Sequence, residues 1–225
     1  MNSIKVFVEI GKKRTFVAAV DWPGWCRSGR DEKAALQALI DYGPRYAQVL
    51  HRRGIEFQVP LDASDLIVTE RHDGNVTTDF GAPAIMLDAD REPIDRIEFE
   101  RLRTLLLACS QAFDSAVQRA SGRELRKGPR GGGRDIEEIL DHVLEANLRY
   151  LARLAWKHQR EGGEDPVEEL SRTRQAILNA LEVAVNGDLP EQGPCGGIIW
   201  PPRYSIRRVA WHVLDHAWEI DDRVV

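Results

Sequence analysis

The hydrophobic pattern of the first part of the chain has the period of two that is typical of β-strands. Residues 4–9 and 14–20 are rich in β-branched side chains that partly alternate with polar ones, and the short run 11–13 (Gly-Lys-Lys) lies between them. Two such runs joined by a short glycine-containing loop predict a β-hairpin. The dipeptide at 23–24 (Pro-Gly) interrupts any regular element, so a turn is predicted there.

A helix and two further strands are predicted after this turn. Alanine and leucine recur over about 31–53, which indicates a helix, and the Gly-Pro pair at 43–44 could interrupt or kink it. The β-branched run 66–71 predicts a strand, and 84–87 predicts a weaker one between two prolines. The pattern therefore predicts a small module with the element order ββαβ.

From residue 94 the period changes to the 3.6 residues of an amphipathic helix. Apolar side chains step by three and four over about 95–121, 135–158, 166–185 and 204–222, with glycine- or proline-containing breaks between these segments. Ser205 is available as the N-cap of the last segment. Four consecutive amphipathic helices predict an antiparallel four-helix bundle.

The expected fold class is therefore α+β, in two parts. Residues 1–90 are predicted to form the ββαβ module and residues 91–225 the four-helix bundle. A chain of 225 residues is long enough for one large domain or for two small ones, each with its own core.

Composition narrows the partners that we expect. The formal net charge is −5 and the pI about 5.7, so no overall basic field favours nucleic acid. No apolar run approaches the length of a membrane span, and the N-terminus does not read as a signal peptide, so we expect a cytoplasmic protein without a membrane partner. The three cysteines are far apart and lack a CxxC motif, which argues against disulfides and a thiolate zinc site.

The candidate chemistry lies in the last predicted helix. His212 and His216 are four residues apart, which puts both imidazoles on one helical face about 6 Å apart along the axis. Two imidazoles in this arrangement can chelate one divalent ion. Of the four remaining histidines, His142 is the best third ligand, because all three flank the apolar stripes of their helices and could meet in one cleft of the bundle.

Two carboxylates are candidates for a catalytic or supporting role. Glu219 follows His216 by three residues on the same face, and Glu138 precedes His142 by four. Each could orient an imidazole, serve as a fourth ligand or act as a base, and each could equally be an ordinary surface carboxylate. His158 lies on nearly the opposite helical face from His142 and is expected to be solvated.

The first part of the chain carries a recognisable motif. A hairpin ends in 20–26 (Val-Asp-Trp-Pro-Gly-Trp-Cys), Ser-Gly follows at 28–29, and an acidic helix start contains Glu32, Ala35 and Leu36. About 70 residues in this pattern resemble the small ββαβ domains of the HicB type, which act as antitoxins or accessory modules. No DNA-binding segment follows here, so the resemblance implies a scaffold or an accessory module rather than an antitoxin.

The second part carries another motif. The segment 135–145 is an Ile/Leu-rich helix start with a single histidine, and 209–216 contains an HxxxH pattern. Together, from residue 94 onward, these resemble the DinB-like metal-binding bundles. The resemblance implies a divalent ion, zinc or nickel, held by His142, His212 and His216 with open positions. It also implies transfer or isomerisation through a low-molecular-weight thiol, such as bacillithiol or mycothiol.

Several functions stay open at this point. The leading hypothesis is a metal-dependent thiol S-transferase or isomerase whose partners are a small thiol and an electrophile, either as a monomer or as a homodimer. A metal-dependent hydrolase is the second hypothesis for the same three-histidine site. Two further hypotheses are a non-catalytic metal-binding or stress-response protein and an interaction adaptor built on residues 1–90.

Overall fold

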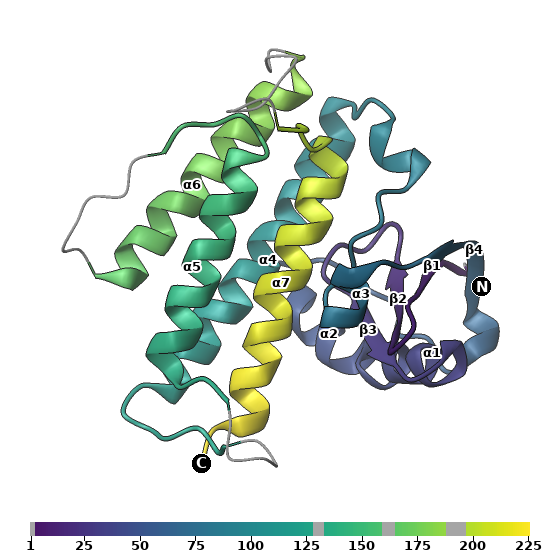
Figure 1. Cartoon of the computed structure of the whole chain (residues 1–225), viewed down its shortest axis with the longest axis horizontal. Coiled ribbons are helices and arrows are strands. Elements are labelled where there is room, and N and C mark those ends of the chain that lie inside the picture. Colours follow the sequence, from purple (N-terminus) through teal and green to yellow (C-terminus); the bar gives the residue numbers. More distant parts are fainter. Residues whose placement is uncertain (1–2, 128–132, 159–164, 188–196) are drawn as a thin grey trace.

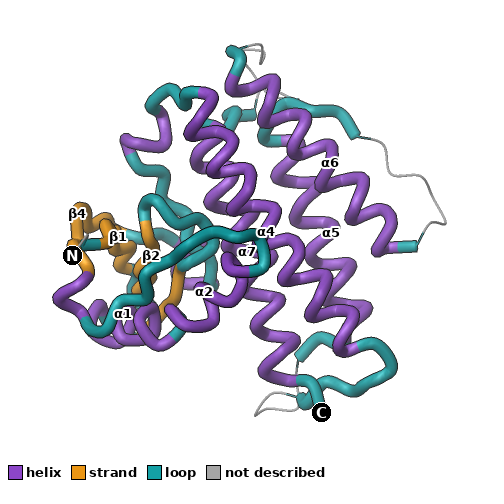
Figure 2. The backbone as a smooth tube through the Cα atoms, turned by 180° about the vertical axis from the view of Figure 1, so that it is seen from behind, coloured by secondary structure: helices purple, strands orange, loops and turns teal. Residues whose placement is uncertain are grey.

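A computed structural model of the chain describes residues 3–127, 133–158, 165–187 and 197–225. The fold is α+β, as the hydrophobic pattern predicts. A small sheet with its own helices lies on one side of the molecule, and long helices lie side by side on the other (Figure 1). Seen from behind, helices α4 (Arg96–Ala120) and α7 (Pro202–Arg223) lie between the sheet and the other long helices (Figure 2). None of the described helices is long and apolar enough to cross a membrane.

The sheet has four strands in the order β3-β2-β1-β4. They are β1 (Ile4–Ile10), β2 (Thr15–Ala19), β3 (Cys26–Gly29) and β4 (Leu66–Asp73). The predicted hairpin is β1–β2, and β4 lies parallel to β1 on the other side. A parallel pair requires a crossover connection, which the helices between β3 and β4 supply.

Strand β3 corrects the predicted ββαβ order, because residues 26–29 pair antiparallel with β2. The strand contains serine and glycine, which have low β-propensity, so it has no apolar pattern of its own. It forms because the Pro23-Gly24 turn returns the chain along β2. Gly24 has a φ of 95°, and a Cβ there would lie 2.7 Å from the Cys109 sulfur, so this turn packs directly on helix α4.

The predicted helix over 31–53 is two helices, α1 (Glu32–Asp41) and α2 (Gly43–His51). Asp31 caps α1 by accepting a hydrogen bond from the Ala34 N–H. The interruption falls at the Gly-Pro pair, because proline is tolerated only in the first turn of a helix.

The chain between β4 and α4 differs from the prediction. It contains a short helix α3 (Val76–Phe80) and a 3₁₀ turn (Asp88–Arg91), and the weak strand predicted at 84–87 is absent. A second 3₁₀ turn (Ala63–Asp65) lies just before β4. The fully buried Glu9 carboxylate accepts hydrogen bonds from the backbone N–H groups of Ala84 and Ile85. These donors are therefore satisfied by a side chain instead of a neighbouring strand.

All four predicted long helices are present. They are α4 (Arg96–Ala120), α5 (Ile136–Ala152), α6 (Pro166–Val185) and α7 (Pro202–Arg223). Helix α7 begins before the predicted start, with Pro201 at the N-cap, so Ser205 is a buried residue inside the helix instead of its cap. Helix α5 ends at Ala152, six residues before its predicted end, and Ala155 beyond it has a positive φ of 55°.

Helix α7 is the centre of the molecule. It contacts α4, α5 and α6 and also the 3₁₀ turn at Asp88–Arg91. Every residue from Tyr204 to Leu214 is buried, although the sequence predicts an amphipathic helix with one exposed side. The polar side is covered because the chain at 83–90 packs on it through Arg207 and Arg208.

One hydrophobic core joins the two parts of the chain. A single cluster of buried side chains includes Val6 and Trp25 from the sheet module and Phe113 and Leu214 from the long helices. The Pro23 carbonyl accepts hydrogen bonds from Tyr46 and from the Cys109 thiol. The division into 1–90 and 91–225 stays a prediction, and the glycine-rich stretch around 128–132 and Cys195 lie outside the described residues.

Candidate metal centre

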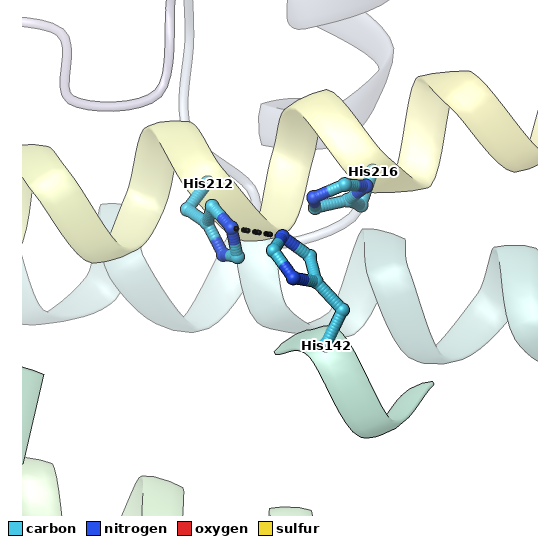
Figure 3. Close-up of side chains that lie close together, drawn as sticks. All are labelled: His142, His212 and His216. Carbon is cyan, nitrogen blue, oxygen red and sulfur yellow. Dashed lines mark hydrogen bonds between the residues drawn. The ribbon is translucent and has the colours of Figure 1, made fainter. Parts of the chain in front are cut away.

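The three predicted ligands lie together between α5 and α7. His212 and His216 are one turn apart on α7, and His142 reaches them from α5 (Figure 3). One ring nitrogen of each residue lies within 4.8 Å of the other two. Among the described residues this is the one group of three or more potential ligands that comes so close together.

One pair of ring nitrogens has a spacing that suits a shared ion. The Nε2 atoms of His142 and His212 are 3.2 Å apart. Two imidazoles on one tetrahedral zinc, with Zn–N distances of about 2.0–2.1 Å, hold their nitrogens about 3.3 Å apart. The ring centroids of the three residues are 4.7 to 5.1 Å apart, and the rings are inclined to one another instead of stacked.

The environment keeps two of the three imidazoles neutral. Burial, followed by the charges of His216, Arg134 and Arg149, lowers the pKa of His142 from 6.5 to about 4. Burial and the neighbouring histidines lower the pKa of His212 well below its ordinary value. Neutral imidazole is the form that coordinates a metal, so these side chains carry an available lone pair at neutral pH.

His216 has a defined hydrogen-bond partner on its other nitrogen. Its Nδ1 lies 2.8 Å from a Glu219 carboxylate oxygen, and the second oxygen of Glu219 accepts from Arg223 Nη1 at 2.5 Å. The hydrogen bond from His216 holds the pKa of Glu219 below its usual range. The carboxylate fixes the proton on Nδ1, which leaves Nε2 of His216 free to coordinate an ion.

Glu219 therefore contacts one of the three histidines, whereas Glu138 forms its hydrogen bonds with Asp135 among the described residues. Glu138 is exposed and forms a capping box with Asp135 at the start of α5, where its carboxylate accepts from the Asp135 N–H at 2.9 Å. The four-residue spacing puts Glu138 and His142 on the same side of the helix. The Glu138 carboxylate instead binds a backbone N–H group at the start of α5, where such groups have no partner within the helix.

His158 also departs from its prediction as a solvated residue. The early end of α5 lets the chain turn, and Nε2 of His158 lies 2.9 Å from a carboxylate oxygen of the buried Glu169 on α6. Cys26 and Cys109 are buried, and burial raises the pKa of both thiols. Neither is an activated nucleophile, because such cysteines have depressed pKa values.

Two residues beside the histidines have no counterpart in the sequence prediction. Tyr150 on α5 lies with its ring centroid 5.8 Å from that of His212, and Arg208 on α7 donates to the Tyr150 hydroxyl at 3.4 Å. In the sequence, Tyr150 falls in an apolar stripe and Arg208 in an ordinary basic pair. The available signal was the four-residue spacing of Arg208 from His212, which puts both on one helical face.

No protein-family model, curated protein or solved structure matches this chain. The HicB-like and DinB-like resemblances thus depend on the motifs alone, and arguments about function start from the geometry of the three histidines.

Proposed function

We propose that His142, His212 and His216 bind one divalent metal ion, zinc or nickel, in a DinB-like four-helix bundle made by α4, α5, α6 and α7. We further propose that the protein is a metal-dependent thiol S-transferase or isomerase that uses a low-molecular-weight thiol. The convergence of three imidazoles from two helices, residues 70 positions apart in the chain, is the observation that carries this proposal.

Each residue of the group has a definite task in this proposal. The two α7 histidines present their nitrogens from one helical face, and His142 completes the set from α5. Glu219, itself held by Arg223, orients His216 through Nδ1. When bound, a divalent ion with an open position lowers the pKa of a thiol or water that reaches it, which supplies a nucleophile at neutral pH.

Metal analysis tests this proposal directly. Purified protein reconstituted with zinc or nickel and desalted should retain about one ion per chain, as measured by plasma mass spectrometry. His142→Ala should retain far less, since a two-histidine site lacks one of its three protein ligands. His142 is only half-buried, so we expect the variant to keep its far-UV circular dichroism.

A matched control removes an imidazole elsewhere. His51 is exposed on α2, and His51→Ala should bind as much metal as the wild type. Loaded protein should then accelerate conjugation of a small thiol with monochlorobimane, and His142→Ala should not. Wild-type protein that retains no metal would refute the site. Metal binding without thiol chemistry would refute the transferase or isomerase and leave a metal-dependent hydrolase or a non-catalytic metal-binding protein.

A further inference from the structure

Arg208 is a buried cation that has no carboxylate partner in the part of the chain that the structure describes. Its exposed fraction is 8%, Nη1 donates to the Pro83 carbonyl, Nη2 donates to the Tyr150 hydroxyl at 3.4 Å, and Nε is buried without a partner. The preceding residue, Arg207, is equally buried but pairs with Asp90. An unpaired buried charge is costly, so the absence of a counter-ion calls for an explanation.

The position of Arg208 links it to the three histidines. Arg208, His212 and His216 follow one another at four-residue spacing on α7, so they share one helical face, with a rise of about 6 Å per step. Tyr150 lies opposite this row on α5, with the Arg208 guanidinium 5.6 Å from its ring centroid. The guanidinium and the phenol are therefore the next polar groups along the face that carries the histidines.

The Tyr150 hydroxyl accepts the hydrogen bond from Arg208 and donates to no acceptor among the described residues, so its O–H group can serve as a donor to a ligand. The side chain is only partly buried, so a ligand at the histidines could reach it. A hydroxyl and a guanidinium together provide hydrogen-bond donors and a positive charge, which is the combination that binds a carboxylate.

We propose that Arg208 and Tyr150 form an anion-binding subsite beside the three-histidine group, for the carboxylate of the substrate thiol or electrophile. The inference rests on the proposed function and adds the substrate class, a carboxylate-bearing molecule. The backbone rise of about 6 Å from His212 to Arg208 favours a short spacer between the reacting sulfur and the carboxylate, so a thiol carboxylate with about two carbons between them is the probe.

The rival interpretation gives Arg208 a purely structural role. In that case its hydrogen bond to the Pro83 carbonyl ties the 83–90 segment to α7, and no anion is needed. The two interpretations differ in one measurable respect, because only the subsite makes ligand affinity depend on the ligand's charge.

Two matched thiols test the subsite. The protein is loaded with Co²⁺, and its visible absorption is titrated with 3-mercaptopropionate and with the neutral 3-mercaptopropionamide. We expect the carboxylate to bind about tenfold more tightly than the amide, as for a hydrogen bond to a charged group. Arg208→Gln should abolish this preference, and Tyr150→Phe, which keeps the ring, should reduce it to about threefold.

Arg149→Gln is the control for general electrostatics. Arg149 is an exposed cation on α5, one residue from Tyr150, and its removal should leave the preference intact. A carboxylate preference that persists in both Arg208→Gln and Tyr150→Phe would overturn the subsite, as would the absence of any preference in the wild type. If Arg208→Gln does not fold, Tyr150→Phe decides alone.

A failure of the metal centre is distinguishable from a failure of the subsite. If the protein takes up no Co²⁺, the proposed function fails, and the subsite is judged on metal-free protein. There, 3-mercaptopropionate should raise the melting temperature of the wild type more than the amide does, and this difference should be smaller in Tyr150→Phe. If the two thiols raise the melting temperature of the metal-free wild type equally, the proposed subsite is overturned.

Discussion

At the scale of single residues, the three histidines differ in what supports them. Nδ1 of His216 forms a hydrogen bond with the Glu219 carboxylate, whereas Nδ1 of His212 is buried without a partner among the described residues. A carboxylate that accepts from a coordinating imidazole fixes its tautomer and raises its basicity. Glu219 should therefore set the affinity of the site more than any other residue that does not itself bind the ion.

Replacing this carboxylate tests its role. Glu219→Gln keeps the size of the side chain but removes the charge that holds the His216 proton on Nδ1. We expect metal affinity to fall about 10- to 100-fold, measured by competition with a chromogenic chelator, with an unchanged fold. Glu138→Gln is the matched control, because Glu138 caps α5 away from the histidines. Equal affinities of Glu219→Gln and wild type would contradict the role.

The same residues predict how the metal-free protein responds to acid. The pKa of His142 is about 4 in the folded protein and near 6.5 when unfolded, so the unfolded chain takes up the proton first as the pH falls. The stability that the folded protein gains from keeping His142 neutral is therefore fully present above about pH 6.5 and is lost progressively towards pH 4. Urea midpoints should fall over this window, and should fall less in His142→Ala. An equal fall in both proteins would show that other groups cause it.

The sequence predicts contacts at the site between residues that are close together in the chain, and it does not by itself predict contacts between distant ones. The His212–His216 pair and its Glu219 neighbour lie within eight residues, so helical spacing alone predicts their shared face. His142 required the further assumption that two predicted helices meet. The Arg208–Tyr150 contact joins positions 58 residues apart, and nothing in the local pattern indicates it.

At the scale of elements, the 83–90 segment is held by charged side chains instead of by a strand. Arg207 pairs with Asp90, which also accepts from the Leu87 N–H, and the Glu9 carboxylate binds the backbone at Ala84 and Ile85. Apolar periodicity cannot predict such a segment, because its hydrogen bonds go to buried charges from β1 and α7. The absence of the strand predicted at 84–87 has this origin in long-range contacts.

Breaking the buried Arg207–Asp90 ion pair should strongly destabilise the folded protein. Asp90→Asn leaves Arg207, whose side chain is 9% exposed, without its counter-charge. We expect the free energy of unfolding to fall by about 3–5 kcal/mol, measured by urea denaturation. Glu145→Gln removes an exposed ion-pair partner of Arg149 and should cost at most about 1 kcal/mol. A small effect of Asp90→Asn would mean that water replaces the lost charge.

At the scale of the whole molecule, the sequence predicts two parts, and the structure gives them one core. The change of hydrophobic period near residue 94 marks the two kinds of element correctly, since every described strand precedes it. The pattern does not show that the Pro23-Gly24 turn packs on Cys109 and Leu214. Periodicity reports which face of an element is buried but not which other element covers it.

This shared core predicts that the parts are not independent. A fragment of residues 91–225 would expose the faces of α4 and α7 that pack against the sheet module. We expect the fragment to be aggregated or to lack near-UV circular dichroism, and the full chain to unfold in one transition. Size-exclusion chromatography and calorimetry check both. A fragment with a sharp transition of its own would support an independent domain.

The central place of α7 also has a consequence for biosynthesis. The ribosome makes this helix after every element that it contacts, so the emerging chain carries a sheet module and three helices with their apolar faces uncovered. Neither the hydrogen bonds of Arg207 and Arg208 to the 83–90 segment nor the histidine group can form until α7 has left the exit tunnel. The nascent protein is thus expected to need chaperone protection until α7 has emerged, and any metal at the three histidines must be acquired afterwards.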